Sequence, residues 1–259
     1  MWLNVAVGLL IPLLGTTLGA SCVFFMKNDL SERLSRALAG FAGGIMVSAS
    51  FFSLLLPALD QTKEHGKLAF IPVGVGFFAG MLFLLLLDKL VPHVHLDRSE
   101  EGPKVGLKKT TKLFLAVTLH NLPEGMVVGI VFAGWIYGKS DITLAGAMVL
   151  AVGIALQNFP EGAVVSMPMR AEGMPKGKTF IFGMLSGVIE PVGALMTAFA
   201  ASLFLPIMPY LLAFAAGAMF YVVVEELVPE MAKGDHSNFG TVCFAVGFVL
   251  MMALDIAFG

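Results

Sequence analysis

Two short sequences in the middle of the chain combine polar residue types that bind metal ions. HNLPEG covers residues 120–125 and QNFPEG covers residues 157–162. Each places a His or Gln four residues before a Glu, and positions i and i+4 share one face of a helix. Each also has an Asn beside that face and a proline before the glutamate, which leaves one backbone carbonyl without its helical donor. These nitrogen and oxygen donors suit a divalent ion such as Zn²⁺ or Fe²⁺ better than Na⁺ or K⁺.

Further carboxylates lie in the apolar segments around the two motifs. They are Glu190 in GVIEPVGA, Glu225 and Glu226 in VVVEELV, and Asp88 and Asp255 near the ends of two other segments. A carboxylate near the centre of a bilayer costs about 3 kcal/mol or more, so it usually faces a cavity or a partner. The four apolar segments that hold the motifs, Glu190 and Glu225 contain no Lys or Arg. We therefore expect protons or metal cations to neutralise them, and two ions bridged by shared glutamates would use these carboxylates better than one ion.

The composition is that of an integral membrane protein. Of 259 residues, 58% are hydrophobic and 13% are charged, and the mean hydropathy is +0.89. A soluble domain is about one quarter charged. The net charge of −2 gives no indication of nucleic-acid binding. The N-terminal segment lacks the basic start of a cleavable signal, so we expect it to be retained as the first span.

The sequence contains eight apolar segments of the length that a bilayer requires, about 20 residues each. They cover residues 3–26, 34–58, 69–91, 113–137, 142–169, 180–205, 209–231 and 239–258. The predicted fold class is therefore all-α, an integral membrane protein of eight transmembrane helices. The longest connection, about 92–112, is too short and too polar for a separate domain, so residues 1–259 are expected to form a single domain.

The basic residues predict the orientation of these spans. The odd-numbered connections hold 13 Lys and Arg residues and the even-numbered ones hold 3, which together are all 16. Lys and Arg accumulate on the cytoplasmic side of membrane proteins. The odd-numbered connections are therefore expected to be cytoplasmic, and with eight spans both termini then lie outside.

Repeated sequences indicate an inverted repeat. HNLPEGMVVG in span 4 returns as QNFPEGAVVS in span 5, 37 residues later, and FAGGIM in span 2 returns as FAAGAM in span 7. The members of each pair lie in spans that run in opposite directions. A pseudo-twofold axis in the membrane plane would relate them, which is a common plan of transporters that bind their substrate near mid-membrane.

These motifs resemble the signature of the ZIP (Zrt/Irt-like) divalent-metal transporters, and the resemblance is closest to the bacterial GufA-like branch. It extends over all eight spans and includes AGGIMVSASFFSLLLPAL, SGVIEPVGA, GAMFYVVVEELVPE and LDIAFG. The resemblance implies eight helices with both termini outside, a two-metal centre between spans 4 and 5, and transport toward the cytoplasm. The ligands that it implies are His120, Glu124, Gln157, Glu161 and Met46 for one ion, and Asn121, Asn158 and Glu190 with the same two glutamates for the second.

The sequence departs from the wider family at two of these positions. Many members have His where this chain has Gln157, and some have an acidic residue or His where it has Asn158. The resemblance implies zinc as the substrate, and because both changes weaken the ligand field, iron, manganese and cadmium remain alternatives. The resemblance also implies a homodimer in a bacterial inner membrane and an elevator-like motion of spans 1, 4, 5 and 6 against spans 2, 3, 7 and 8.

Other polar residues are weaker candidates for the ion pathway. His93 and His95 could receive an ion that leaves the site, although an H-x-H pair at a membrane border is as often an ordinary interfacial feature. Ser53 and Asp60 could line an entrance, although a solvated acid in a loop is an equally good reading of Asp60. The remaining pathway candidates are the carboxylates Asp88, Glu225 and Asp255.

Two other functions are compatible with a polar cluster in a membrane. An intramembrane metal-dependent hydrolase would activate water on zinc, but the pattern H-E-x-x-H and the pattern G-x-S-x-G are both absent from the sequence. A metal sensor that binds without transporting is the third interpretation. The repeated motifs favour a transporter rather than an enzyme.

Overall fold

The computed structural model describes residues 1–25, 31–94, 100–138, 142–204, 207–234 and 237–259. Within these residues it confirms the predicted fold class, because eight helices are long and apolar enough to cross a membrane. They are Trp2–Phe25, Glu32–Gln61, Phe70–Leu90, Lys109–Tyr137, Leu144–Ala171, Lys176–Ala200, Met208–Ala232 and Phe239–Phe258. The eight predicted segments match them in number and order.

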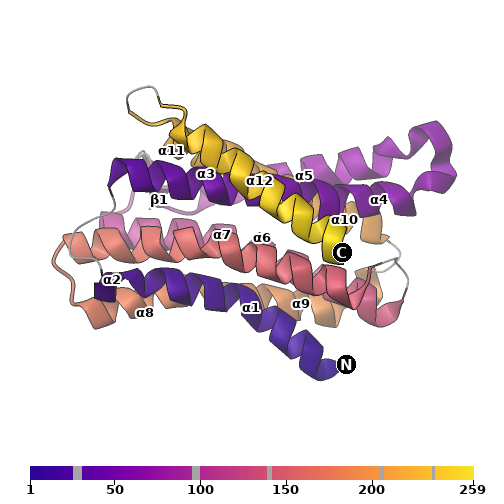
Figure 1. Ribbon diagram of the computed structural model, residues 1–259, viewed down its shortest axis with the longest axis horizontal. Coiled ribbons are helices and arrows are strands. Elements are labelled where there is room, and N and C mark those ends of the chain that lie inside the picture. Colours follow the sequence, from indigo (N-terminus) through magenta and orange to yellow (C-terminus); the bar gives the residue numbers. More distant parts are fainter. Residues whose placement is uncertain (26–30, 95–99, 139–141, 205–206, 235–236) are drawn as a thin grey trace.

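The first three spans and the described parts of their connections contain seven helical elements, of which Figure 1 labels α1 to α5. These are α1 (Trp2–Ala20), α2 (Cys22–Phe25), α3 (Glu32–Ala49), η1 (Ser50–Leu55), α4 (Leu56–Gln61), η2 (Lys63–Leu68) and α5 (Phe70–Leu90). The connection that follows contains two short antiparallel strands, β1 (His93–Val94) and β2 (Glu100–Glu101), with His93 opposite Glu101. The remaining elements are α6 (Lys109–Tyr137), α7 (Leu144–Ala171), α8 (Lys176–Gly187), α9 (Ile189–Phe204), α10 (Met208–Val222), η4 (Val223–Leu227), α11 (Val228–Ala232) and α12 (Phe239–Phe258).

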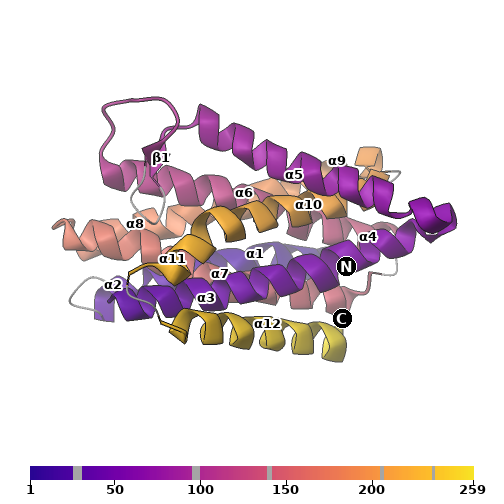
Figure 2. The ribbon, with the colours of Figure 1, turned by 90° about the horizontal axis from the view of Figure 1, so that it is seen from above.

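Helices α6 and α7 run through the middle of the bundle (Figures 1 and 2). On one side of them lie α1, α8 and α9, and on the other side lie α3, α5, α10 and α12. The most extensive packing joins α1 to α7 and α6 to α9, and separately joins α3 to α12 and α5 to α10. Each of these four packed pairs lies within one of the two groups that were predicted to move against each other, and the motion itself stays a prediction.

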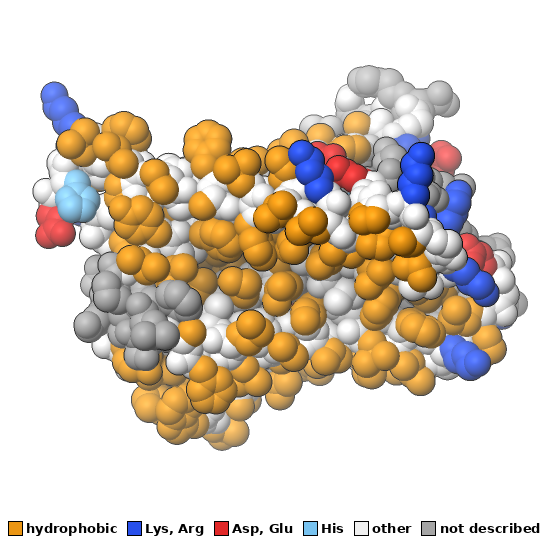
Figure 3. Space-filling view, turned by 180° about the vertical axis from the view of Figure 1, so that it is seen from behind, with side chains coloured by type: hydrophobic (Ala, Val, Ile, Leu, Met, Phe, Trp, Pro, Cys, Tyr) orange, Lys and Arg blue, Asp and Glu red, His pale blue; other side chains and the backbone are white. Residues whose placement is uncertain are grey.

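The outer surface shows how the bundle fits a bilayer. Hydrophobic side chains cover most of the visible flank, and most of the visible Lys and Arg gather at one end (Figure 3). That end is opposite to the end at which both termini lie (Figure 1). The two ends of the bundle thus differ in basic charge as the count along the sequence predicted, and we call them the basic end and the terminal end.

Spans 2 and 7 each contain a π-helix, η1 and η4, and the two occupy equivalent positions. Ser50 begins η1 four residues after Met46 of FAGGIM, and Val223 begins η4 four residues after Met219 of FAAGAM. A proline follows each π-helix after one intervening residue. Short π-helical segments are rare and frequent at functional sites. Their matching positions support the predicted inverted repeat.

Candidate metal centre

Two central helices bring the repeated motifs together. HNLPEG lies in α6 and QNFPEG in α7, and both helices continue through the proline of their motif. His120, Asn121, Glu124, Gln157 and Asn158 are all buried. A direct hydrogen bond joins the two motifs, since Gln157 Nε2 donates to Glu124 Oε1 at 2.7 Å.

A break in span 6 brings a third helix to this point. The span is interrupted at Val188, between α8 and α9, so that Glu190 lies in the first turn of α9. Asn121 Nδ2 donates to Glu190 Oε1 and to the Ser186 carbonyl, each at 3.2 Å. Glu190 is thereby joined to the HNLPEG motif of α6.

The residues in the two motifs and Glu190 share one property: each keeps a buried polar atom that has no hydrogen-bond partner. These atoms are His120 Nε2, Asn121 Oδ1, Glu124 Oε2, Gln157 Oε1, Asn158 Oδ1, Glu161 Oε2 and Glu190 Oε2. Buried polar atoms are nearly always hydrogen-bonded, because an unsatisfied one costs about 1–3 kcal/mol. One nitrogen and six oxygens that lack hydrogen-bond partners, three of them carboxylate oxygens, are a donor set that divalent cations can satisfy.

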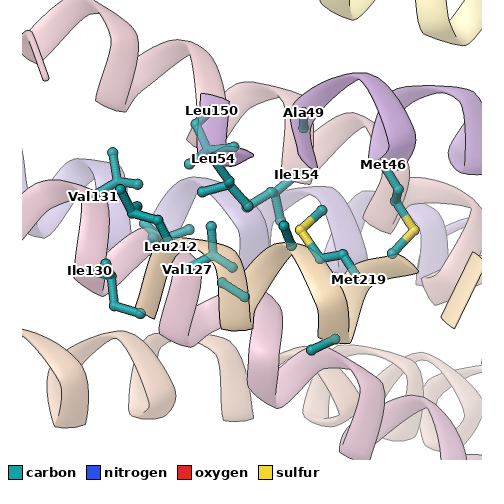
Figure 4. Close-up of a cluster of buried hydrophobic side chains, with 14 of the residues drawn as sticks. Met46, Ala49, Leu54, Val127, Ile130, Val131, Leu150, Ile154, Leu212 and Met219 are labelled. Atoms are coloured by element: carbon teal, nitrogen blue, oxygen red, sulfur yellow. The ribbon is translucent and has the colours of Figure 1, made fainter. Parts of the chain in front are cut away.

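Along α6 and α7, an apolar cluster lies between these residues and the terminal end, and Figure 4 shows its side chains. Its side chains come from α3, η1, α6, α7 and α10 and are all nearly or fully buried. The labelled members are Met46, Ala49, Leu54, Val127, Ile130, Val131, Leu150, Ile154, Leu212 and Met219. Met46, the predicted thioether ligand, is fully buried in this cluster, and Met219 is its counterpart in the inverted repeat.

A cavity leads from the motifs in the opposite direction, toward the basic end. Its volume is about 40 Å³, which is room for a few water molecules. His120 and Glu161 line its inner part, and Ser35, Glu226 and Glu230 belong to its lining from α3, η4 and α11. The candidate centre is therefore reached from one end of the bundle and covered by apolar side chains toward the other.

The family model described as ZIP Zinc transporter matches residues 110–255 of the chain. The chain belongs to the ZIP family. It is 33% identical over 323 residues to Zinc transporter ZIP11 of Homo sapiens, with 94% of each chain covered. It is 35% identical to Zinc transporter GufA of Myxococcus xanthus, again with 94% of each covered, and 38% identical to Zinc transporter ZIPB of Bordetella bronchiseptica, with 94% of this chain and 78% of that protein covered. The resemblance to the ZIP family seen in the sequence motifs is thereby confirmed.

A second group of side chains whose types can bind a metal ion lies beside the candidate centre in this ZIP chain. Asp88 Oδ1 is 3.5 Å from His93 Nε2 and 3.8 Å from His120 Nε2, and Asp88 and His93 are fully buried. Donor atoms of Asp88, His93 and Glu101 lie within 4.8 Å of one another, close enough to share one ion. The short β1–β2 pair brings Glu101 to this place. His95, the other histidine of the predicted pair, lies outside the described residues.

The remaining predicted pathway residues differ in their contacts and exposure. They are Ser53, Asp60, Glu225 and Asp255. Ser53 Oγ donates to both carboxylate oxygens of Asp255, at 3.0 and 2.8 Å, and so joins η1 to α12. Asp60 is exposed and forms an ion pair with Lys63 at 2.8 Å, which fits the alternative interpretation of a solvated acid. Glu225 is exposed on η4, while its neighbour Glu226 is buried and lines the cavity. The structure therefore brings Glu226 to the cavity rather than Glu225.

Thr16 of α1 is a polar residue at the centre that the sequence motifs did not reveal. It is fully buried, and its Oγ1 donates to Glu190 Oε1 at 2.9 Å. A threonine in an apolar helix usually bonds the backbone of its own helix, so its residue type gave no signal. The surrounding sequence GTTLG does indicate a close helix contact at this place, because two small residues four positions apart allow two helices to pack closely.

Proposed function

We propose that the chain transports divalent transition-metal ions, zinc above all, across the membrane toward the cytoplasm. The observation that carries this proposal is the set of seven buried donor atoms without hydrogen-bond partners in the two motifs and at Glu190, within an eight-helix bundle. In the proposed centre Glu124 and Glu161 bridge two ions. His120, Gln157 and Met46 complete the first site, and Asn121, Asn158 and Glu190 complete the second.

The direction of transport is argued from the two ends of the bundle. Because Lys and Arg favour the cytoplasmic side, we assign the basic end to the cytoplasm and both termini to the outside. The cavity then opens inward, and the apolar cluster closes the outer side. A transporter needs an alternate state in which the centre faces outward. Sliding the group that contains α1, α6, α7, α8 and α9 against the other group would produce it.

The whole chain, residues 1–259, acts as one transport domain in this proposal, and two copies form a homodimer in a bacterial inner membrane. The exposed side chains of α5 and α12 are predominantly apolar and belong to the group that would stay fixed in the membrane. Metal ions are the substrate, and no catalytic role is assigned to any residue.

The proposal is tested with purified full-length protein in sealed liposomes that contain a zinc-sensitive dye. We expect zinc to enter protein-containing liposomes faster than protein-free ones, and competing divalent metals to slow it. Peptide cleavage without flux would indicate a hydrolase, and zinc binding with neither activity would indicate a sensor. Either result would contradict the proposed function.

Uptake at a fixed concentration of free zinc is expected to fall as the external medium becomes acidic. His120 and the glutamates must be deprotonated to bind an ion, so protons compete with zinc for the same atoms. The decrease should reach up to about tenfold per pH unit for each proton that the ion displaces, measured from about pH 8 to about pH 5.5. Initial rates across this range measure it, and a rate that rises steadily with acid would indicate proton coupling instead.

Cysteine labelling is expected to show which side the cavity faces. In a background with Cys22→Ser and Cys243→Ser, Leu113→Cys places a thiol in the lining of the cavity and Ile154→Cys places one in the apolar cluster. A membrane-impermeant maleimide should label Leu113→Cys in inside-out vesicles and should leave Ile154→Cys mostly unmodified there. Labelling of Leu113→Cys only from the outside would reverse the proposed orientation.

A further inference from the structure

Thr16 uses its hydroxyl differently from its neighbour on α1. Thr17 Oγ1 donates to the Leu13 carbonyl of the same helix at 2.7 Å, as threonines in helices commonly do. Thr16 Oγ1 donates instead to the carboxylate of Glu190, which is 174 positions away in the sequence. The side chain of Thr16 is therefore directed at the candidate metal centre.

Close packing of α1 against α7 places Thr16 at this depth. A Cβ atom added at Gly15 or Gly19 would overlap the backbone of α7, and one added at Gly162 would overlap the carbonyl oxygen of Thr16. Small residues at such contacts allow two helix backbones to touch. Since Gly162 is the last residue of QNFPEG, the contact sets Thr16 beside that motif.

The inverted repeat gives Thr16 and Glu190 equivalent positions. Gly125 ends HNLPEG as Gly162 ends QNFPEG. A Cβ atom at Gly125 would overlap the backbone of Glu190, just as one at Gly162 would overlap that of Thr16. One half of the molecule therefore supplies a hydroxyl where the other half supplies a carboxylate, and the two side chains meet in a hydrogen bond.

The hydrogen bonds to Glu190 distinguish its two oxygens. Oε1 accepts from Thr16 Oγ1 at 2.9 Å and from Asn121 Nδ2 at 3.2 Å, whereas the buried Oε2 has no hydrogen-bond partner. Two donors from two different helices fix the first oxygen, which restricts rotation of the carboxylate. Oε2 is then held in one position for a ligand.

We propose that Thr16 is a positioning residue for the second ion, acting through Glu190 and not as a ligand itself. This inference rests on the two-ion centre of the proposed function. Groups that orient a metal ligand typically change metal affinity by about 10–100-fold when they are removed. Loss of the Thr16 hydroxyl should therefore lower the affinity for the second ion and leave the affinity for the first ion unchanged.

The test is equilibrium binding of Zn²⁺ to the purified full chain, measured by dialysis and elemental analysis. The wild-type protein is expected to bind two ions per chain. Thr16→Val keeps the shape of the side chain but removes its donor, and should weaken the second ion at least about tenfold. Thr16→Ser restores the donor and should bind both ions within about twofold of wild type, since the hydroxyl rather than the methyl group acts on Glu190.

Thr17→Val is the matched control, because it makes the same change at the adjacent residue, whose hydroxyl donates to the Leu13 carbonyl of its own helix. Thr17→Val should leave the affinities for both ions unchanged. If Thr16→Val cannot be purified in folded form, Thr16→Ala removes the hydroxyl without adding volume and carries the same expectation.

The possible results of this binding experiment separate the role of Thr16 from the existence of the two-ion centre. Two ions bound with wild-type affinity by Thr16→Val contradict the role of Thr16 alone. Equal weakening of zinc binding in Thr16→Ser and Thr16→Val would mean that packing rather than the hydroxyl controls the second site. That result would also contradict the proposed role of Thr16. A wild-type chain that binds only one ion contradicts the two-ion centre itself, and this inference with it.

Discussion

Glu124→Gln and Glu161→Gln are each expected to reduce zinc uptake about 100-fold or more, since even groups that only orient a ligand contribute about 10–100-fold to metal affinity. Each change removes one charge and one oxygen donor from the middle of the centre. In the proposed geometry each glutamate contacts both ions, so neither site stays intact. Initial rates of zinc entry into liposomes, with equal amounts of folded protein, measure the effect.

Glu225→Gln is the matched control for these two substitutions. Glu225 is exposed on η4, one residue from the buried Glu226 that lines the cavity. The same chemical change at this position should leave uptake within about twofold of wild type, as expected for a surface substitution away from special features. Near-normal uptake by Glu161→Gln would contradict the bridging role of that residue.

The sequence predicted the parts of this structure that follow from local pattern. The length and polarity of each segment predicted the eight spans, and the i to i+4 spacing within HNLPEG and QNFPEG predicted which side chains share a face. Those features depend on residues a few positions apart. The same local reasoning identified Glu190 as an acidic residue in an apolar segment, although not its place at the start of a separate helix, α9.

Tertiary contacts decided what the sequence did not reveal. Thr16 reaches the centre because glycines let α1 touch α7, and its partner lies 174 residues further along the chain. The choice between Glu225 and Glu226 depended on a π-helix, which changes the direction of the side chains relative to a regular helix. Glu101 joins Asp88 and His93 through a pair of two-residue strands that are too short to predict from periodicity.

Gln157→His is expected to increase the preference for zinc over manganese by roughly tenfold to a hundredfold, the range by which single groups tune metal sites. Gln157 Nε2 donates to Glu124 Oε1 at 2.7 Å, and its Oε1 is the atom left for an ion. An imidazole can replace both functions, because one ring nitrogen donates to the carboxylate while the other binds the metal. The ion would then have two nitrogens and two carboxylates, close to what Zn²⁺ prefers, whereas Mn²⁺ favours oxygen donors.

Competitive uptake of zinc and manganese by the two proteins measures this preference as a ratio, which is independent of the amount of active transporter. Maximal zinc uptake need not rise, because a more tightly held ion also leaves more slowly. Phe159→His is the matched control, since it adds an imidazole to the exposed face of α7 only two residues away. A ratio that stays the same in Gln157→His would show that Gln157 does not contact the ion, and the first of the two proposed sites would then have to be placed elsewhere.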